Sequence, residues 1–166
     1  MQFNKSFCIQ DRIISNTSST FIVAEAGVNH CGDINTAKKL IDLASKAGAD
    51  AIKFQTFKTE NLILSSVKKA PYQQKTTNYE ESQFDMLKKL EVTEAENLIL
   101  KQYCKEQNII FLTTPFDESS LDSIDALDLP AYKIASTDAT NLPFLKKLQR
   151  KENRYYYQPV CVTWMR

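Results

Sequence analysis

The chain has 166 residues, of which 43% are hydrophobic and 25% are charged, and its formal net charge is +1. This length and balance suit one globular unit with a substantial hydrophobic core. Because the 21 basic residues are nearly balanced by 20 acidic ones, we expect no nucleic-acid partner and no attraction to an anionic membrane surface.

The cysteines and the N-terminal segment indicate the cellular compartment in which we expect the protein. The four cysteines are Cys8, Cys31, Cys104 and Cys161. They form no C-x-x-C pair and no zinc-like Cys/His spacing, so we expect thiols in a reducing environment. Asp11 and Arg12 interrupt the N-terminal segment, and no apolar run approaches the ~20 residues of a membrane helix. We therefore expect neither a signal peptide nor a membrane span, and a cytoplasmic protein.

The first 30 residues divide into a leader and a strand. Residues 1–20 form a polar leader with scattered apolar residues, which predicts a short hairpin. A buried strand is expected at 21–25, and it ends in Glu25, followed closely by Asn29 and His30. A carboxylate at such a strand end needs a partner, a metal-linked ligand or a polar substrate. The alternative is an ordinary strand end with a solvated loop.

The remaining pattern alternates helices and strands. Asp33 as N-cap and Gly48 at the C′ position bound a helix, and 49–56 is the second strand. The long polar segment 57–82 is of the kind found in functional or disordered connections. The later elements are a helix at 82–90, a helix opened by the Thr93–Glu96 capping box and ending near 107, a strand at 109–113, a helix at 119–127, a strand at 131–134, and a helix at 141–149.

Polar residues gather where the expected parallel strands end. They are Glu25, Asn29, Lys53, Gln55, Thr113, Thr114, Lys133 and Ser136. Parallel α/β folds place their sites at that end of the sheet. A single strand lysine more often extends toward solvent, but two of them beside hydroxyl groups indicate an anion site for a phosphate or carboxylate. No G-x-G-x-x-G or P-loop is present, which excludes those nucleotide sites.

Several ordered motifs resemble the sialic acid synthase family over about residues 20–150. The matching segments are Ala24–His30, Ala47–Thr56, Thr113–Phe116, Tyr132–Ile134 and Asn141–Pro143, with Lys69–Gln73 and Glu81–Gln83 similar to bacterial members that include legionaminic acid synthases. The resemblance implies the N-terminal part, about four strands, of a (β/α)8 TIM barrel that is incomplete here. The family barrel is followed by a small antifreeze-like domain.

The resemblance also implies a reaction. Family members condense phosphoenolpyruvate with N-acetylmannosamine, which gives N-acetylneuraminate and phosphate. A divalent Mn or Mg ion polarises the sugar aldehyde, and its histidine ligands lie in later strands that this chain does not reach. Members are typically homodimers in which the antifreeze-like domain covers the partner's site. That contact is not expected here.

Site roles follow from the resemblance motif by motif. Lys53, Thr114, Lys133 and Ser136 resemble residues that hold phosphoenolpyruvate, and Glu25 and Gln55 resemble groups on the sugar side or groups that orient water. Asp138 stands where the family has Glu, so a catalytic carboxylate is kept but is one methylene shorter. Asn29 and His30 belong to the motif without an assigned step, and the alternative for His30 is an imidazole that bonds a loop carbonyl.

Residues 151–166 depart from the family pattern. They carry no strand or helix signal, although the family has its fifth strand here. One permitted coding of this tail, read in another frame, gives Pro-Ile-Leu-Leu-Ser-Thr-Gly-Met, which resembles that strand. The hypothesis is a frameshifted, truncated gene product, and the alternative is a divergent tail.

Three functional readings therefore remain. The first is a synthase. The second is a non-catalytic fragment or pseudogene product, in which the outer strands of the half barrel, the first and the fourth, lack partners. The third is another phosphoenolpyruvate-condensing barrel that makes 3-deoxy sugar acids, against which the motifs at Glu25–His30 and Lys53–Thr56 argue.

Overall fold

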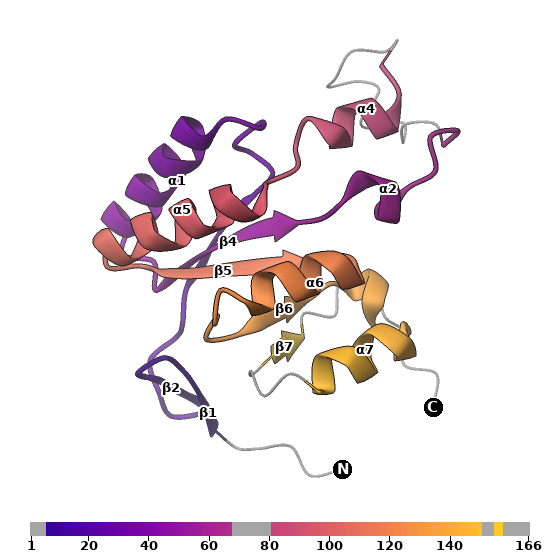
Figure 1. The fold of residues 1–166 in the computed structure, drawn as a ribbon. Coiled ribbons are helices and arrows are strands. Elements are labelled where there is room, and N and C mark those ends of the chain that lie inside the picture. The colour runs from indigo at the N-terminus through magenta and orange to yellow at the C-terminus, as the bar shows by residue number, and fades with distance from the viewer. Residues whose placement is uncertain (1–5, 68–80, 151–154, 158–166) are drawn as a thin grey trace.

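The computed structural model describes residues 6–67, 81–150 and 155–157, which alternate between strands and helices (Figure 1). The strands are β1 (Ser6–Ile9), β2 (Arg12–Ser15), β3 (Val23–Gly27), β4 (Ala51–Thr56), β5 (Ile110–Pro115), β6 (Tyr132–Ile134) and β7 (Tyr155–Tyr157). The helices are α1 (Ile34–Lys46), α2 (Thr59–Leu62), α4 (Gln83–Lys88), α5 (Glu94–Glu106), α6 (Glu118–Asp125) and α7 (Leu142–Gln149), with a short 3-10 helix η1 (Ser136–Asp138). The α/β class predicted from the sequence is confirmed.

The central sheet is parallel and follows the order β3-β4-β5. Glu25 pairs with Lys53 in the β3–β4 register, and Gln55 pairs with Thr114 in the β4–β5 register. The β3 register shifts between Glu25 and Gly27, where Gly27 adopts a positive φ of 53°. This bulge lets the chain leave the sheet directly after Glu25, because glycine tolerates that backbone conformation without steric penalty.

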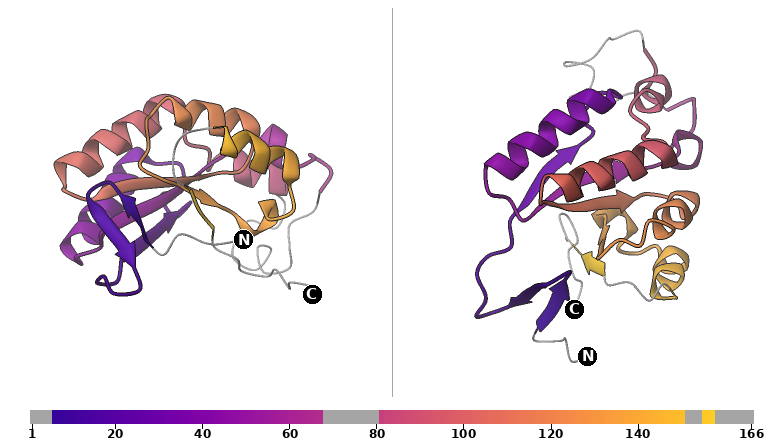
Figure 2. Two further views of the ribbon diagram at one scale, coloured as in Figure 1. Left: turned by 90° about the horizontal axis from the view of Figure 1, so that it is seen from below. Right: turned by 60° about the vertical axis from the view of Figure 1, so that its left-hand side comes forward.

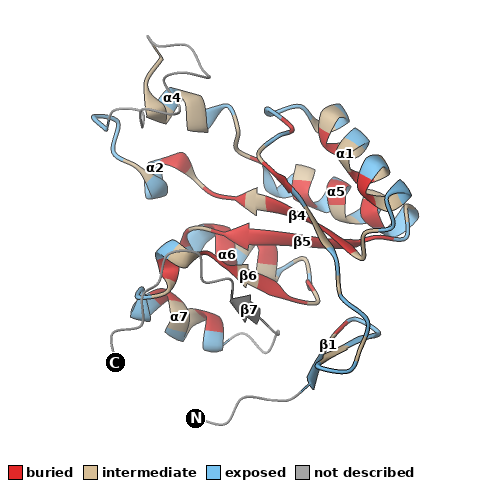
Figure 3. Ribbon diagram, turned by 180° about the vertical axis from the view of Figure 1, so that it is seen from behind, coloured by how far each residue is buried: buried red, intermediate tan, exposed pale blue. Residues whose placement is uncertain are grey.

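Helices α1 and α5 cover one face of this sheet, and α6 and α7 continue the same layer (Figures 1 and 2). The apolar stripe of α1 buries Ala37, Ile41 and Ala44 against Ile52 and Phe54 of β4. Such burial contributes roughly 25 cal/mol for each Å² of apolar surface removed from water, which makes this layer the main source of stability. Strands β4 and β5 are accordingly buried along most or all of their length (Figure 3).

The predicted helix boundaries are largely confirmed by their caps. The Asp33 side chain accepts the N–H groups of residues 35 and 36, and Thr93 and Glu96 form the reciprocal capping box. Gly48 follows α1 with φ +77°, as a C′ glycine should. The side chain of Asn141 accepts the N–H of residue 144 at the start of α7.

The opposite face of the sheet carries a smaller apolar cluster near the beginnings of the strands. It consists of Ile9, Ala51, Ile110, Leu112 and Ala131, with Ile14, Phe21 and Val23 packed beside them. Ile9 and Ile14 belong to the antiparallel β1–β2 hairpin, which lies where the sequence predicts one. The hairpin therefore covers the amino-terminal end of this face and leaves the carboxyl-terminal end to polar residues.

Beyond β5, strand β6 opens a second, two-stranded sheet. It pairs in parallel with β7, so Tyr155–Tyr157 is a strand at the position of a fifth barrel strand. The expectation that this stretch has no strand character, and that the fourth barrel strand lacks a partner, is wrong here. Tyrosine favours extended backbone, and the edge of β6 offers unpaired peptide groups. The other tail residues, 151–154 and 158–166, lie outside the described part.

Two short elements were not expected. The helix α2 follows β4 at once, and η1 follows β6, so both lie just past the carboxyl ends of strands. The motif at Lys69–Gln73 lies outside the described residues. Within the described ranges, no helix combines the length and apolar character needed to cross a membrane.

Candidate functional site at the carboxyl ends of the strands

Five polar side chains share the inner face of the sheet, the face opposite the helices. Residues alternate between faces along a strand. The neighbours Ala51, Ile110, Leu112, Ala131 and Val23 all belong to the inner cluster. Counting by two from these residues places Glu25, Lys53, Gln55, Thr114 and Lys133 on that same face. The sequence prediction that these residues converge is consistent with this placement.

Lys53 and Glu25 form an ion pair between adjacent strands, in which the ammonium group donates to Oε2 of the carboxylate. The Lys53 side chain is 5% exposed, whereas that of Glu25 is 52% exposed. A buried ammonium group needs a counter-charge. Glu25 therefore neutralises Lys53 from the open side of the sheet, and the partner that the sequence required for Glu25 is Lys53.

Gly27 keeps the space beside this pair open. A Cβ atom at Gly27 would lie 3.2 Å from Oε1 of Glu25 and 3.5 Å from Nε2 of Gln55. The side chains of Glu25 and Gln55 thus approach the same point from neighbouring strands. Glycine is needed here both for its positive φ and for this close approach.

Lys133 of β6 and Asp138 of η1 extend the cluster. Burial lowers the pKa of Lys133, and the nearby Lys53 ammonium lowers it further, while Glu25 and Asp138 act in the opposite direction. Burial raises the pKa of the Asp138 carboxyl, against the influence of Asn141 and Lys133. Two ammonium groups and two carboxylates therefore share one electrostatic environment, which is typical of functional sites.

Two oxygen atoms in this region are buried without a hydrogen-bond partner. They are Oγ1 of Thr114 and Oδ2 of Asp138, whose other oxygen accepts from Nδ2 of Asn141 at 3.3 Å. Thr113, on the opposite face, bonds its hydroxyl to Thr56 at 2.9 Å. Buried polar atoms are rarely left unpaired, so Thr114 and Asp138 are the groups best placed to meet a ligand. Ser136 is partly buried in the same short helix.

The other two motif residues do not join this cluster. Asn29 is exposed in the loop after β3. His30 is buried on the helix side, with its ring 6.1 Å from that of Phe54. Its Nδ1 accepts the N–H of Gly32 at 3.1 Å, so the ring bonds the loop backbone as the alternative expected, but through an N–H group and not a carbonyl. The reason is the turn at residues 30–32, which aims a backbone donor at the ring.

Sequence reasoning missed Asp117 as an anchor of the strand ends. Its carboxylate accepts the N–H of Lys58 at 2.9 Å, the amide of Asn61 at 3.2 Å and the N–H of Ser120 at 2.9 Å. Hydrogen bonds lower the pKa of Asp117 to about 2, against the opposing effect of burial. Asp117 therefore joins the start of α6 to the segment after β4. Its position before a predicted helix was the available signal.

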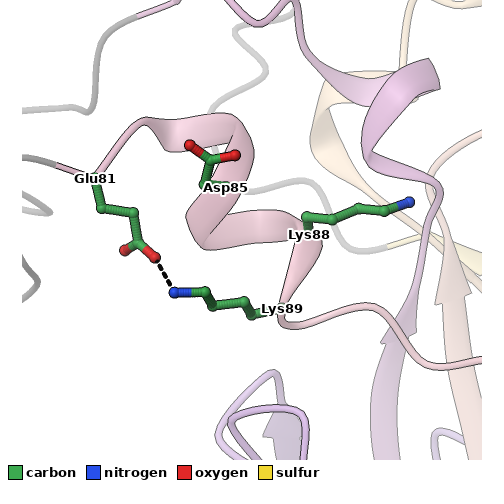
Figure 4. Close-up of a pocket in the computed structure, with 4 residues that line it drawn as sticks. All are labelled: Glu81, Asp85, Lys88 and Lys89. Atoms are coloured by element: carbon green, nitrogen blue, oxygen red, sulfur yellow. Dashed lines mark hydrogen bonds and ion pairs between the residues drawn. The ribbon is translucent and has the colours of Figure 1, made fainter.

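A separate surface pocket of about 460 Å³ lies along α4 (Figure 4). Glu81, Asp85, Lys88 and Lys89 line it, and Lys89 donates to Glu81 at 2.6 Å. The other two lining side chains have partners outside this set: Lys88 donates to Glu60 at 2.8 Å, and Asp85 accepts from the Ser82 hydroxyl at 2.7 Å. Such exposed pairs are ordinary solvated contacts. The pocket offers no buried unpaired group and is not part of the site.

Three described cysteines, Cys8, Cys31 and Cys104, are thiols, and Cys161 lies outside the described residues. Burial raises the pKa of Cys104 to about 12, which makes it unreactive. Within the described ranges, no group of three His, Cys, Asp or Glu side chains is arranged to hold a metal ion. The described residues thus do not fit the divalent metal that the family resemblance implies.

Comparison with known proteins identifies the family. Residues 40–156 match the model of the NeuB family. The chain is 52% identical over 131 residues to "N,N'-diacetyllegionaminic acid synthase" of Campylobacter jejuni, covering 79% of this chain and 39% of that protein. It is 31% identical over 140 residues to human "N-acetylneuraminate-9-phosphate synthase", covering 84% of this chain and 39% of the relative.

A solved structure gives the same result for the fold. The crystal structure of N-acetylneuraminic acid synthetase from Leptospira borgpetersenii superposes with a TM-score of 0.79 at 28% identity, covering 95% of this chain and 50% of that one. The fold is accordingly the N-terminal part of a (β/α)8 barrel, and the chain spans about two fifths of the length of the curated relatives it matches. The protein belongs to the NeuB family.

Proposed function

We propose that this chain carries the phosphoenolpyruvate-binding half of a synthase that makes nonulosonic acids such as N-acetylneuraminate. In the proposed reaction, the enolpyruvate carbon attacks the aldehyde of N-acetylmannosamine or a related amino sugar. Water adds at the adjacent carbon, and phosphate leaves by C–O cleavage. The observation that carries the proposal is the convergence of Lys53, Lys133 and the unpartnered Thr114 hydroxyl on one face of the strand ends.

The proposed roles follow the chemistry of each group. Lys53, Lys133, Thr114 and Ser136 supply cationic and hydroxyl donors, which are what phosphate and carboxylate oxygens require. Glu25 and Gln55 face the sugar or the attacking water, and Asp138 is the second catalytic carboxylate. A raised pKa lets Asp138 hold a proton closer to neutral pH than an ordinary aspartate can.

A divalent Mn or Mg ion enters this proposal only through the family resemblance. When bound, such an ion would polarise the sugar aldehyde. The described residues offer no group of three ligating side chains, so we derive no step through it. Cytoplasmic location likewise remains an expectation from the sequence, and the homodimer contact of family members is not expected for this chain.

One observation favours a particular product class. The relative at 52% identity is named for N,N'-diacetyllegionaminic acid, and a second relative of the same name, from Legionella pneumophila, is 41% identical over 137 residues. We therefore propose a precursor of legionaminic acid as the second candidate acceptor. A solved 3-deoxy-D-arabino-heptulosonate 7-phosphate synthase is only 12% identical, and that likeness concerns the fold alone.

The deciding experiment is metal-dependent release of phosphate from phosphoenolpyruvate by the purified 166-residue chain. The assay is run with N-acetylmannosamine, with a legionaminic acid precursor, and with no sugar. Sugar-dependent release would support the synthase and contradict the fragment reading. Binding of phosphoenolpyruvate without turnover would support a half site that lacks catalysis. If the chain neither binds phosphoenolpyruvate nor releases phosphate from it, the proposal is overturned.

A further inference from the structure

His30 occupies a position that the proposed reaction does not use. It is the single histidine of the chain, and it is 2% exposed. It lies in the loop that joins β3, which carries Glu25, to α1. A buried imidazole on the helix side of that loop is well placed to control the loop without touching a substrate.

The hydrogen bonding of the ring fixes its proton. The N–H of Gly32 donates to Nδ1 at 3.1 Å, so Nδ1 must present a lone pair. In the neutral ring the proton is then on Nε2, which is buried and has no hydrogen-bond partner. Protonation would place a second N–H on Nδ1, opposite the N–H of Gly32. Two donors would face each other, and the bond would be lost.

The charged groups around the ring do not reverse this preference. Glu91, before α5, and Glu96, on α5, line the small cavity beside the imidazole, and α1 contributes only apolar side chains there. The charge of Glu96 favours the protonated ring, but burial is the larger effect, and the pKa of His30 is lowered from 6.5. The ring of Phe54 on β4 is uncharged. Burial and the bond from the Gly32 N–H therefore both favour the neutral ring.

The loop itself has little freedom to adapt. Gly32 has φ +78°, and a Cβ atom there would lie 2.2 Å from the carbonyl oxygen of Lys89. The backbone of Gly32 therefore lies against the end of α4 on one side and bonds the imidazole through its N–H. Further backbone bonds join Asn29 to Ala26 at 2.9 Å and Asp33 to His30 at 2.9 Å. These bonds connect the turn to Ala26 at the end of β3, the strand that carries Glu25.

We propose that neutral His30 is a pH-sensitive positioning residue, which holds the loop of residues 28–33 through the Gly32 N–H and releases it on protonation. Release would loosen the turn that follows the strand end at which Glu25 pairs with Lys53. This proposal concerns the loop and does not depend on which reaction the site performs. Loss of phosphoenolpyruvate binding would therefore count against the proposed function and leave this proposal standing.

The composition of the chain makes a direct test practical. Because there is one histidine, its ring resonances in an NMR spectrum of the full chain belong to His30 without assignment. Only three glycines are present, and Gly48 at the end of α1 serves as the internal control for Gly32. The spectra are recorded from pH 8 to pH 5, above the range in which ordinary carboxylates titrate.

Three results are expected in this titration. At pH 8 the ¹⁵N shift of Nδ1 is that of an unprotonated acceptor. The ring then titrates with a midpoint below 6.5, and the Gly32 amide resonance moves with the same midpoint while Gly48 does not. A protonated Nδ1 at pH 8, or a Gly32 amide that ignores the His30 midpoint, would overturn the proposal.

Two variants separate positioning from mere packing. His30→Asn puts a non-titrating amide oxygen near the position of Nδ1, so the Gly32 amide should stay protected and become insensitive to pH. His30→Gln carries its amide farther out and should expose Gly32 to exchange about tenfold faster, relative to Gly48, already at pH 8. An unchanged pH response of Gly32 in the Asn variant would refute the proposal. If that variant fails to fold, the titration of the unmodified chain still decides.

Discussion

Lys53 and Glu25, which are 28 residues apart in the sequence, form an ion pair between β4 and β3 at the carboxyl end of the sheet. The lysine is buried and the glutamate is half exposed, so the carboxylate balances the charge from the side on which a substrate would arrive. The pair is therefore a stabilising contact in the free protein and part of the proposed site.

Replacement of Glu25 by Gln should destabilise the chain by about 1–3 kcal/mol, because it leaves the Lys53 ammonium buried without a counter-charge. Urea denaturation measures the loss. The matched control is Glu118→Gln, which removes one of two acidic partners of the surface residue Lys147 and should change stability by about 0–1 kcal/mol. Equal losses of stability in the two variants would show that the buried Lys53 ammonium does not need the Glu25 carboxylate as its counter-charge.

Replacement of Lys133 by Met should weaken phosphoenolpyruvate binding about tenfold or more, because a charged donor to the anion is lost. In the unmodified chain, affinity should fall as pH rises through the pKa of Lys133, which burial lowers below 10.5. The variant should lack that alkaline fall. Titration calorimetry across pH measures both effects, with Lys146→Met on the exposed side of α7 as the control.

The two adjacent threonines of β5 should respond in opposite ways to replacement by Val. Thr114→Val removes a buried hydroxyl that has no partner, so stability should barely change while anion affinity falls. Thr113→Val breaks the bond to Thr56 and should cost about 1 kcal/mol with no effect on affinity. Thermal denaturation and the same binding assay distinguish them. A stability loss confined to Thr114→Val would contradict its assignment as a ligand-facing group.

Asp117 should be the more important of two helix caps. Asp117→Ala removes the cap of α6 and leaves the N–H of Lys58 and the side-chain amide of Asn61 without an acceptor. The expected loss in the free energy of unfolding is about 2–4 kcal/mol. Asp33→Ala removes an exposed cap of α1 and should cost about 0.5–2 kcal/mol. Urea denaturation of both variants measures the difference, and a larger loss for Asp33→Ala would refute the anchoring role of Asp117.

The pH dependence of stability gives a second measure of Asp117. Its folded pKa, about 2, lies below the ordinary value of 3.8, so the unfolded chain binds the proton more readily. The stabilisation is thus complete above pH 4 and is lost as pH falls from about 4 toward 2. Denaturation of Asp117→Asn over this range should show a shallower dependence on pH than the unmodified chain.

Alanine substitutions at Gly32 and Gly48 should distinguish the cost of backbone strain from the cost of a steric overlap. Both have φ near +78°, but a Cβ at Gly48 meets nothing within 4 Å, whereas one at Gly32 would overlap the carbonyl oxygen of Lys89. Gly48→Ala should cost roughly 1–2 kcal/mol from strain alone. Gly32→Ala should cost about 2–5 kcal/mol, because overpacking is added. Similar values in urea denaturation would mean that the turn can move away from α4.

The sequence by itself determined the elements and most of their boundaries. Apolar periodicity and cap residues such as Asp33, Thr93 and Asn141 act locally, so they can be read from neighbouring residues. The strand pattern likewise placed Lys53, Thr114 and Lys133 at carboxyl ends, because the two-residue alternation of a strand is a local property. Family motifs along the chain then indicated the same fold as the solved relative.

Only the tertiary structure decided which of these residues meet. The pairing of Glu25 with Lys53, the unpartnered hydroxyl of Thr114 and the anchoring by Asp117 depend on strand register and on helix packing between distant segments. The same holds for His30, which the motif placed beside Asn29 but which the turn at Gly32 directs to the opposite face. Residues adjacent in sequence can face opposite sides of a sheet, so a motif alone cannot assign them to one site.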